Sequence, residues 1–243
     1  MAFPTTRWSV VLGASRGKEG GGSPKALHEL CAVYWKPLYA YLRRDGLTPE
    51  DAEDMVQGFL SSLLSRPAID GVEAERGRFR AYLLGALRNY LLNARVRDRA
   101  QKRGGEATHV PLSVAGQGAG IDLQIPDGRT PEAAYAYVWA MAILQQTEDK
   151  LAAQHEARGK AEAFAALRPF LTSGDAPAYR DVAERLGTTE AAARVAVHRL
   201  RTEFRTVLRQ HVADTVANPS TADIDDELRA VIGAIAEHQD PVG

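Results

Sequence analysis

The stretch YRDVAERLGTTEAAARVAVHRLR, residues 179–201, decides the fold of the carboxy-terminal part of the chain. Its first part has apolar residues at helical spacing and ends at Gly187, a residue type that terminates helices well. A threonine, Thr188 or Thr189, then caps a second helix. A helix, a tight glycine turn and a second helix together predict a helix-turn-helix.

The second helix has two distinct faces. One face recurs at helical spacing and is expected to point inward: Ala193, Val197, Leu200 and Phe204. The other carries the candidate DNA-contacting residues Thr189, Arg194, Val195, His198 and Arg199. Small side chains would let this helix enter a DNA major groove, where arginine pairs with guanine and an apolar tip contacts the thymine methyl. The alternative is a plain connection between packed helices with solvated arginines, because short motifs of this kind are common.

Helical periodicity extends over the remainder of the 243-residue chain, so we predict an all-α protein with two helical domains joined by a flexible linker. The expected segments are residues 1–104, a glycine-rich linker at 105–130, the helix-turn-helix domain at 131–216 and an acidic extension at 217–243. The net charge of −1 combines a basic stretch at 78–103 with this acidic end, and a basic block favours a polyanionic partner.

The basic stretch, GRFRAYLLGALRNYLLNARVRDRAQKRGG, combines cations, aromatic rings and amides on one predicted helix. Cations contact the phosphate backbone, aromatic faces stack on unpaired bases and amides read base edges. The candidate single-strand contacts are Arg80, Tyr82, Arg88, Asn89, Asn93, Arg95 and Arg97. Tyr82 also fits the apolar stripe of the helix, so core packing is the alternative for most of its area.

A second candidate surface is the acidic start of the helix predicted from Thr48-Pro49. Asp51, Glu53 and Asp54 lie in its first turns, followed by Gln57. Acidic residues stabilise a helix N-terminus by about 0.3 to 1 kcal/mol each, which gives them a purely structural explanation. Because clustered acids also repel one another, docking on a basic groove of a partner is the second interpretation.

The order and spacing of three segments resemble the bacterial extracytoplasmic-function sigma factors. These segments are YWKPLYAYLRRDGLTPEDAEDMVQGFLSSLL at 34–64, FRAYLLGALRNYLLNARVRDR at 79–99 and YRDVAERLGTTEAAARVAVHRLRTEFRTVLR at 179–209. TRWSVVLGA at 6–14 and DDELRAVIGAI at 225–235 resemble one subgroup of that family. Tyr82 replaces the family's usual tryptophan and Asn93 replaces a frequent aspartate, so the minus-ten preference does not transfer.

The resemblance implies a subunit without catalytic chemistry that directs core RNA polymerase to promoter DNA. Asp51, Glu53, Asp54 and Gln57 would then bind the polymerase, and the residues between Arg80 and Arg97 would bind the minus-ten strand. Thr189, Arg194, Val195, His198 and Arg199 would read the minus-35 element. An anti-sigma protein is a further partner that the resemblance allows.

The sequence offers less support for other functions. A free-standing helix-turn-helix regulator stays an alternative, although no dimerisation seam or effector pocket is evident. So does a sigma mimic that sequesters an anti-sigma protein. We expect no cofactor or metal site, because Cys31 is the single cysteine and the six histidines lack ligand spacing. An N-terminus without signal-peptide features and no long apolar run predict a cytoplasmic protein without membrane insertion.

The acidic extension has its own pattern. Acids at 223–227 precede the apolar residues Leu228, Val231, Ile232 and Ile235, which predicts a short amphipathic helix. It would either fold back on a basic or apolar surface and restrain the free protein, or pack without any regulatory role.

Overall fold

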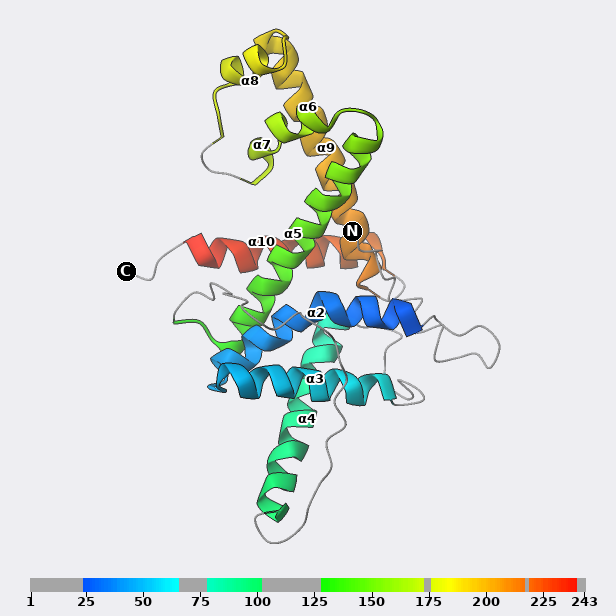
Figure 1. Cartoon of the computed structure of the whole chain (residues 1–243), viewed down its shortest axis with the longest axis vertical. Helices are drawn as coiled ribbons and strands as arrows, with labels where there is room; N and C mark the ends of the chain where they lie inside the picture. The colour runs from blue at the N-terminus through cyan, green and yellow to red at the C-terminus, as the bar shows by residue number, and fades with distance from the viewer. Residues whose placement is uncertain (1–23, 66–77, 102–127, 173–175, 217–218, 240–243) are drawn as a thin grey trace, which may run out of the picture. The chain divides into compact units, whose positions relative to one another are not determined.

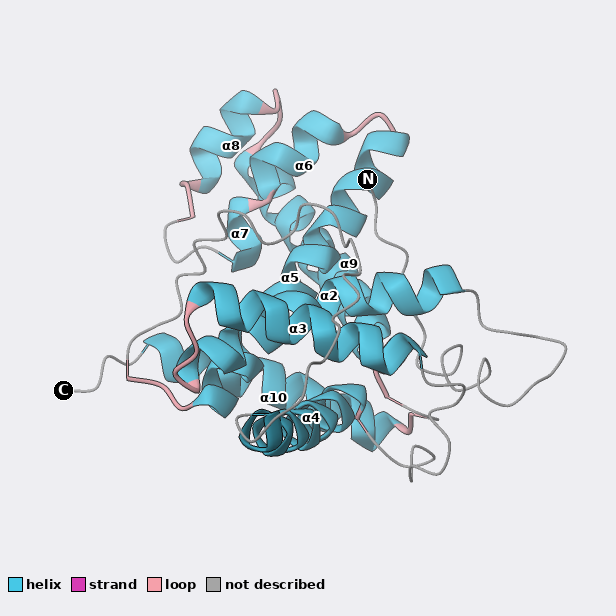
Figure 2. Ribbon diagram, turned by 60° about the horizontal axis from the view of Figure 1, so that its bottom comes forward, coloured by secondary structure: helices cyan, strands magenta, loops and turns pink. Residues whose placement is uncertain are grey.

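The computed structural model describes residues 24–65, 78–101, 128–172, 176–216 and 219–239, and these are almost entirely helical (Figures 1 and 2). The helices are α2 (Pro24–Arg44), α3 (Pro49–Ser65), α4 (Phe79–Gln101), α5 (Pro131–Ala157), α6 (Ala161–Leu167), α7 (Pro169–Thr172), α8 (Tyr179–Arg185), α9 (Glu190–Asp214) and α10 (Thr221–Gln239). Within the described ranges the β pairing is an isolated antiparallel bridge between Arg78 and Val216. The all-α prediction is therefore confirmed there, whereas nearly all of the expected linker at 105–130 lies outside the described residues.

The described chain divides into two compact units. One, which we call the α4 unit, contains the described residues up to 141 together with those from 214 onward. The other, the helix-turn-helix unit, contains residues 142–213. Residues 131–141 and the extension, which the sequence separated from the amino-terminal segment, thus belong to the same compact unit as α2, α3 and α4.

The core of the α4 unit is built from one face of each helix. Helices α2 and α3 lie side by side (Figure 1), and α2 continues through Pro37. The indole Nε1–H of Trp139, on α5, donates a hydrogen bond of 3.1 Å to the Tyr34 hydroxyl. The edge of Phe79, the first residue of α4, meets the ring of Tyr34 at 5.0 Å between centroids. These buried aromatic contacts connect helices far apart in sequence.

Helix α3 begins with a reciprocal cap. The Thr48 hydroxyl accepts a hydrogen bond of 3.2 Å from the Asp51 backbone N–H and donates one of 2.7 Å to the Asp51 carboxylate. This arrangement is close to a capping box, except that the Asp51 carboxylate bonds to the Thr48 hydroxyl rather than to the Thr48 backbone N–H. Asp51 therefore has a local structural role in starting α3.

The helix-turn-helix unit contains the predicted pair of helices, α8 and α9, on either side of Gly187. Its core gathers buried side chains of α5, α6, α7, α8 and α9, among them Leu151, Phe164, Phe170, Val182, Val197 and Leu200. Gly187 has a φ of 59° after α8, a left-handed conformation that glycine adopts without strain. The hydroxyl of Thr189 accepts a hydrogen bond of 3.2 Å from the Ala192 backbone N–H, so Thr189 caps α9.

No helix in the described part of the chain is both long enough and apolar enough to cross a bilayer.

Candidate nucleic-acid interface

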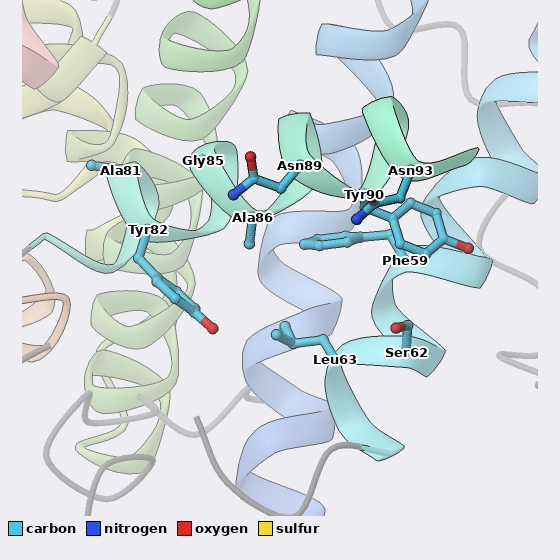
Figure 3. Close-up of a pocket in the computed structure, with 10 residues that line it drawn as sticks. All are labelled: Phe59, Ser62, Leu63, Ala81, Tyr82, Gly85, Ala86, Asn89, Tyr90 and Asn93. Atoms are coloured by element: carbon cyan, nitrogen blue, oxygen red, sulfur yellow. The ribbon is translucent and has the colours of Figure 1, made fainter. Parts of the chain in front are cut away.

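A pocket of about 400 Å³ lies between α3 and α4 of the α4 unit (Figure 3). Its lining residues are Phe59, Ser62, Leu63, Ala81, Tyr82, Gly85, Ala86, Asn89, Tyr90 and Asn93. The rings of Phe59 and Tyr90 meet edge to face, with centroids 5.7 Å apart. The pocket thus brings together three residues of the predicted single-strand set, Tyr82, Asn89 and Asn93.

The pocket's composition suits a flat, partly polar group. Tyr82 and Tyr90 are half-buried, so their rings pack in the unit and still border the pocket. Asn89 is exposed and forms no hydrogen bond with another described residue, which leaves its amide available to a ligand. Aromatic surface beside amide groups is how proteins hold unpaired bases.

Tyr90 reaches the pocket because α3 has a glycine opposite it. A Cβ atom built on Gly58 would lie 2.7 Å from the Tyr90 hydroxyl oxygen, closer than a carbon and an oxygen can approach. Any larger residue at position 58 would therefore displace this ring. Sequence reasoning missed both Gly58 and Phe59, because the contact depends on how α3 and α4 pack.

The outer surface of α4 carries unusual apolar exposure. Leu92 is 58% exposed and Val96 is 64% exposed, and both follow Asn89 at spacings of three and seven residues. Residues at these spacings share one helix face. The exposed face of α4 is therefore a mixed surface of amides and aliphatic side chains that begins at the pocket.

Two predicted arginines of α4 are paired with carboxylates from other elements of the unit. The Arg88 guanidinium bonds to the Glu132 carboxylate and donates a hydrogen bond of 3.2 Å to the Tyr41 hydroxyl. These contacts raise the pKa of Arg88, chiefly through Tyr41 and then through Glu132. Arg95 donates a hydrogen bond of 3.0 Å to Asp45. Both arginine side chains remain exposed by about half, 47% and 58% respectively, so these pairs are solvent-accessible.

Arg80 is more deeply engaged. Its Nε and Nη2 atoms donate to the two carboxylate oxygens of Glu227 at 2.5 and 3.1 Å, and its guanidinium lies 4.9 Å from the centroid of the Trp139 ring. Burial by itself lowers the pKa of Arg80, but the hydrogen bond and charge of Glu227 raise it above the ordinary value. Arg97 belongs to α4, and its side chain lies outside the described residues.

The predicted reading surface of α9 is exposed. Val195 is 51% exposed, and Ala191, Ala192, His198 and Arg199 are exposed as well. Arg199 forms no hydrogen bond or ion pair with another described residue. Arg194, on the same helix, bonds to Glu190 at 2.6 Å and lies 4.3 Å from the centroid of the Tyr179 ring, so its side chain is held on the surface.

The acidic face of α3 is partly used by the fold. Asp51 belongs to the cap with Thr48, whereas Asp54 is exposed and Glu53 and Gln57 are half-buried. Among the described residues no group of three or more histidine, cysteine or acidic side chains could hold a metal ion.

Comparisons with protein-family models, with curated proteins and with solved structures found no match for this chain. The described residues therefore define an all-helical class of protein. One of its units contains a helix-turn-helix, and the other contains a pocket beside the arginine-bearing helix α4.

Proposed function

We propose that this protein is a sigma factor, which directs core RNA polymerase to specific promoters. In this proposal the helix-turn-helix unit binds the minus-35 duplex, and the α4 unit opens the minus-ten element and holds one of its strands. In this proposal residues 105–130 form a flexible linker, and the protein acts in the cytoplasm without catalytic activity of its own.

One observation carries the proposal. The chain has two surfaces of different kinds: an exposed helix α9, whose small side chains would fit a major groove, and a pocket beside α4, whose aromatic and amide lining would fit an unstacked base. A duplex-only regulator has no use for the second surface. A protein that binds double-stranded DNA at one site and melted DNA at another needs both.

The acidic face of α3 supports polymerase docking. Thr48 and Asp51 satisfy each other in the cap, so the local fold does not require Asp54, which is exposed on the same helix. Next to this cap, Glu53, Asp54 and Gln57 offer two carboxylates and an amide to a basic surface of a partner.

Transcription from purified components tests the proposal. Core polymerase incubated with this chain and sheared genomic DNA should produce transcripts whose 5′ ends share one upstream motif in two parts. Arg199→Ala should abolish most of this signal and leave polymerase binding intact. Transcripts that start at random, or only as often as with core polymerase alone, would contradict the proposed function.

A further inference from the structure

Helix α10 buries a carboxylate in the α4 unit. The side chain of Glu227 is 0% exposed, and it shares the inward face of α10 with Val231 and Ala234, at spacings of four and seven residues. Ile232, in contrast, is 65% exposed. The helix is therefore turned so that an acid lies inside while a large apolar side chain lies in solvent, which burial of apolar surface alone would not favour.

Two arginines at the start of α4 explain this orientation. Arg80 binds Glu227 through two nitrogens, and Arg78 Nε lies 3.0 Å from a Glu227 oxygen. A second acid, Asp226, lies 3.7 Å from Arg78. The Arg78 side chain is 38% exposed and the Arg80 side chain is 18% exposed, so both remain partly accessible from solvent.

The two arginines present to Glu227 the geometry that they would present to a phosphate. Arginine binds carboxylate and phosphate oxygens with the same planar fork, through short charge-assisted hydrogen bonds. We propose that Arg78 and Arg80 form a binding site for a backbone phosphate of single-stranded nucleic acid, and that Glu227 occupies this site in the free protein. Helix α10 is then an internal competitor of the nucleic acid.

The site is continuous with the base pocket. The backbone N–H of Tyr82 donates a hydrogen bond of 3.2 Å to the Arg78 carbonyl, so the two residues lie one helical turn apart. Residues four apart share a helix face. A strand that places a base beside Tyr82 therefore passes Arg78, where its phosphate would meet the guanidinium groups.

Displacement of α10 is energetically reasonable. A buried ion pair contributes little net stability compared with an apolar residue of similar size, because both charges lose their hydration. A phosphate that replaces Glu227 would restore the arginines' bonds and return the carboxylate to water. The backbone N–H of Phe79 binds the Thr215 carbonyl at 3.1 Å, which holds the chain ahead of α10, and Ser220 and Asp223 cap α10 locally, so α10 would move as one helix.

A matched pair of charge-removing variants tests this site, which rests on the proposed function for its nucleic-acid ligand. The full chain and its variants Glu227→Gln and Glu237→Gln would be titrated with a fluorescent oligothymidine at several salt concentrations. Glu237 is exposed on the same helix, so its variant controls for the lost negative charge. Each arginine that the loss of the Glu227 charge frees for a phosphate should steepen the slope of log affinity against log salt by about 0.7. Glu227→Gln should bind the oligothymidine about fivefold more tightly than the Glu237→Gln control.

Equal affinities and slopes for the two variants would overturn the phosphate site. Should Glu227→Gln fold poorly, hydrogen exchange in the unchanged protein gives the answer: residues 221–239 should exchange faster once the oligothymidine is bound, and unchanged or slower exchange overturns the site. An oligothymidine that binds neither the original chain nor Glu227→Gln would contradict both this site and the proposed function. Binding by the original chain with no effect of Glu227→Gln contradicts the phosphate site alone.

Discussion

Helices α4 and α9 both carry arginines that the sequence predicts to contact nucleic acid, but the two sets of arginines differ in their interactions within the protein. On α4, Arg80, Arg88 and Arg95 each meet a carboxylate from another element of the unit: Glu227, Glu132 and Asp45. On α9, Arg199 extends from the surface without a partner among the described residues. These three cations of α4 thus take part in tertiary structure, whereas Arg199 contributes no ion pair to the described part of the fold.

The difference has a consequence for binding. A ligand of α9 meets a surface that is already exposed, so it gains the full attraction of the arginine. A ligand of α4 must replace existing ion pairs, so its net gain per arginine is smaller. We therefore expect the duplex-binding surface of α9 to be already formed in the free protein. Strand binding by α4, in contrast, should depend on replacing the ion pairs between its arginines and the carboxylates of the unit.

The largest expected effect concerns Trp139, whose ring lies against the Arg80 guanidinium. Trp139 is 1% exposed, bonds to Tyr34 and stacks with the Arg80 guanidinium. Trp139→Ala should reduce the free energy of unfolding by about 3 to 5 kcal/mol, measured by urea denaturation. Val195→Ala, on the exposed α9 surface, should change it by less than about 0.5 kcal/mol. Similar losses in the two variants would remove the contrast between the buried surroundings of Arg80 and the exposed surface of α9.

A second experiment sharpens the role of α9. Arg199→Ala should cost about 1 to 3 kcal/mol of promoter affinity if the side chain reads a guanine. If it contacts a phosphate, the log-log salt slope should fall by about 0.9 instead. Arg205→Ala, on the same helix and also exposed, is the matched control. Titrations of duplex promoter DNA that show equal behaviour for both variants would exclude Arg199 from the interface.

The helix-turn-helix unit also contains a buried titratable group. The Thr147 hydroxyl donates to the Ile143 carbonyl at 2.8 Å, so it accepts from His211 Nδ1 at 3.1 Å and selects the neutral Nδ1–H tautomer. Burial, and then the charge of Lys150, lower the pKa of His211 to about 4. The ordinary histidine pKa is about 6.5, so the unfolded chain takes up this proton first as the pH falls.

Stability should therefore be full above about pH 6.5 and decrease as the pH falls toward 4, by at most about 1.4 kcal/mol per pH unit from this group. Urea denaturation at successive pH values measures the effect. His211→Gln should flatten the slope in that window, and His198→Gln, at an exposed position, should leave it unchanged. A slope that is identical in His211→Gln and the original chain would show that His211 titrates normally.

The smallest expected effect compares the two helix caps. Thr48→Ala removes both bonds of the reciprocal cap on α3, whereas Thr189→Ala removes one bond at the start of α9. Each substitution should cost about 1 kcal/mol of unfolding free energy, with the larger loss at Thr48. Thermal denaturation measures both. A larger loss at Thr189 would mean that Thr189 also stabilises tertiary contacts, beyond its hydrogen bond with Ala192.

Local signals account for what the sequence predicted well. Proline and threonine at 48–49 and 130–131, and glycine at 187, fix helix boundaries through caps and backbone conformation, and the structure has α3, α5 and α8 at those limits. Periodicity likewise identified the inward face of α9, where Ala193, Val197 and Leu200 are buried. Such signals lie within a few residues of the feature they predict.

Long-range pairing accounts for what the sequence left open. The sequence predicts an amphipathic helix in the extension, and α10 is a helix that buries Val231. It also buries Glu227 and exposes Ile232, because Glu227 pairs with Arg78 and Arg80, which lie 147 or more residues earlier in the chain. The Tyr90 and Gly58 contact is of the same kind. Nothing local to residues 58 or 227 marks these partners, so the pocket wall and the internal ion pair emerge only from the packed structure.

Binding to core RNA polymerase tests the central claim most directly. The purified chain, mixed with core polymerase and passed through a gel-filtration column, should elute with the enzyme at a one-to-one ratio. A variant with Glu53→Lys and Asp54→Lys should elute mostly apart from it. If the unchanged chain elutes separately from core polymerase at micromolar concentration, the protein is not a sigma factor and its two surfaces serve another complex.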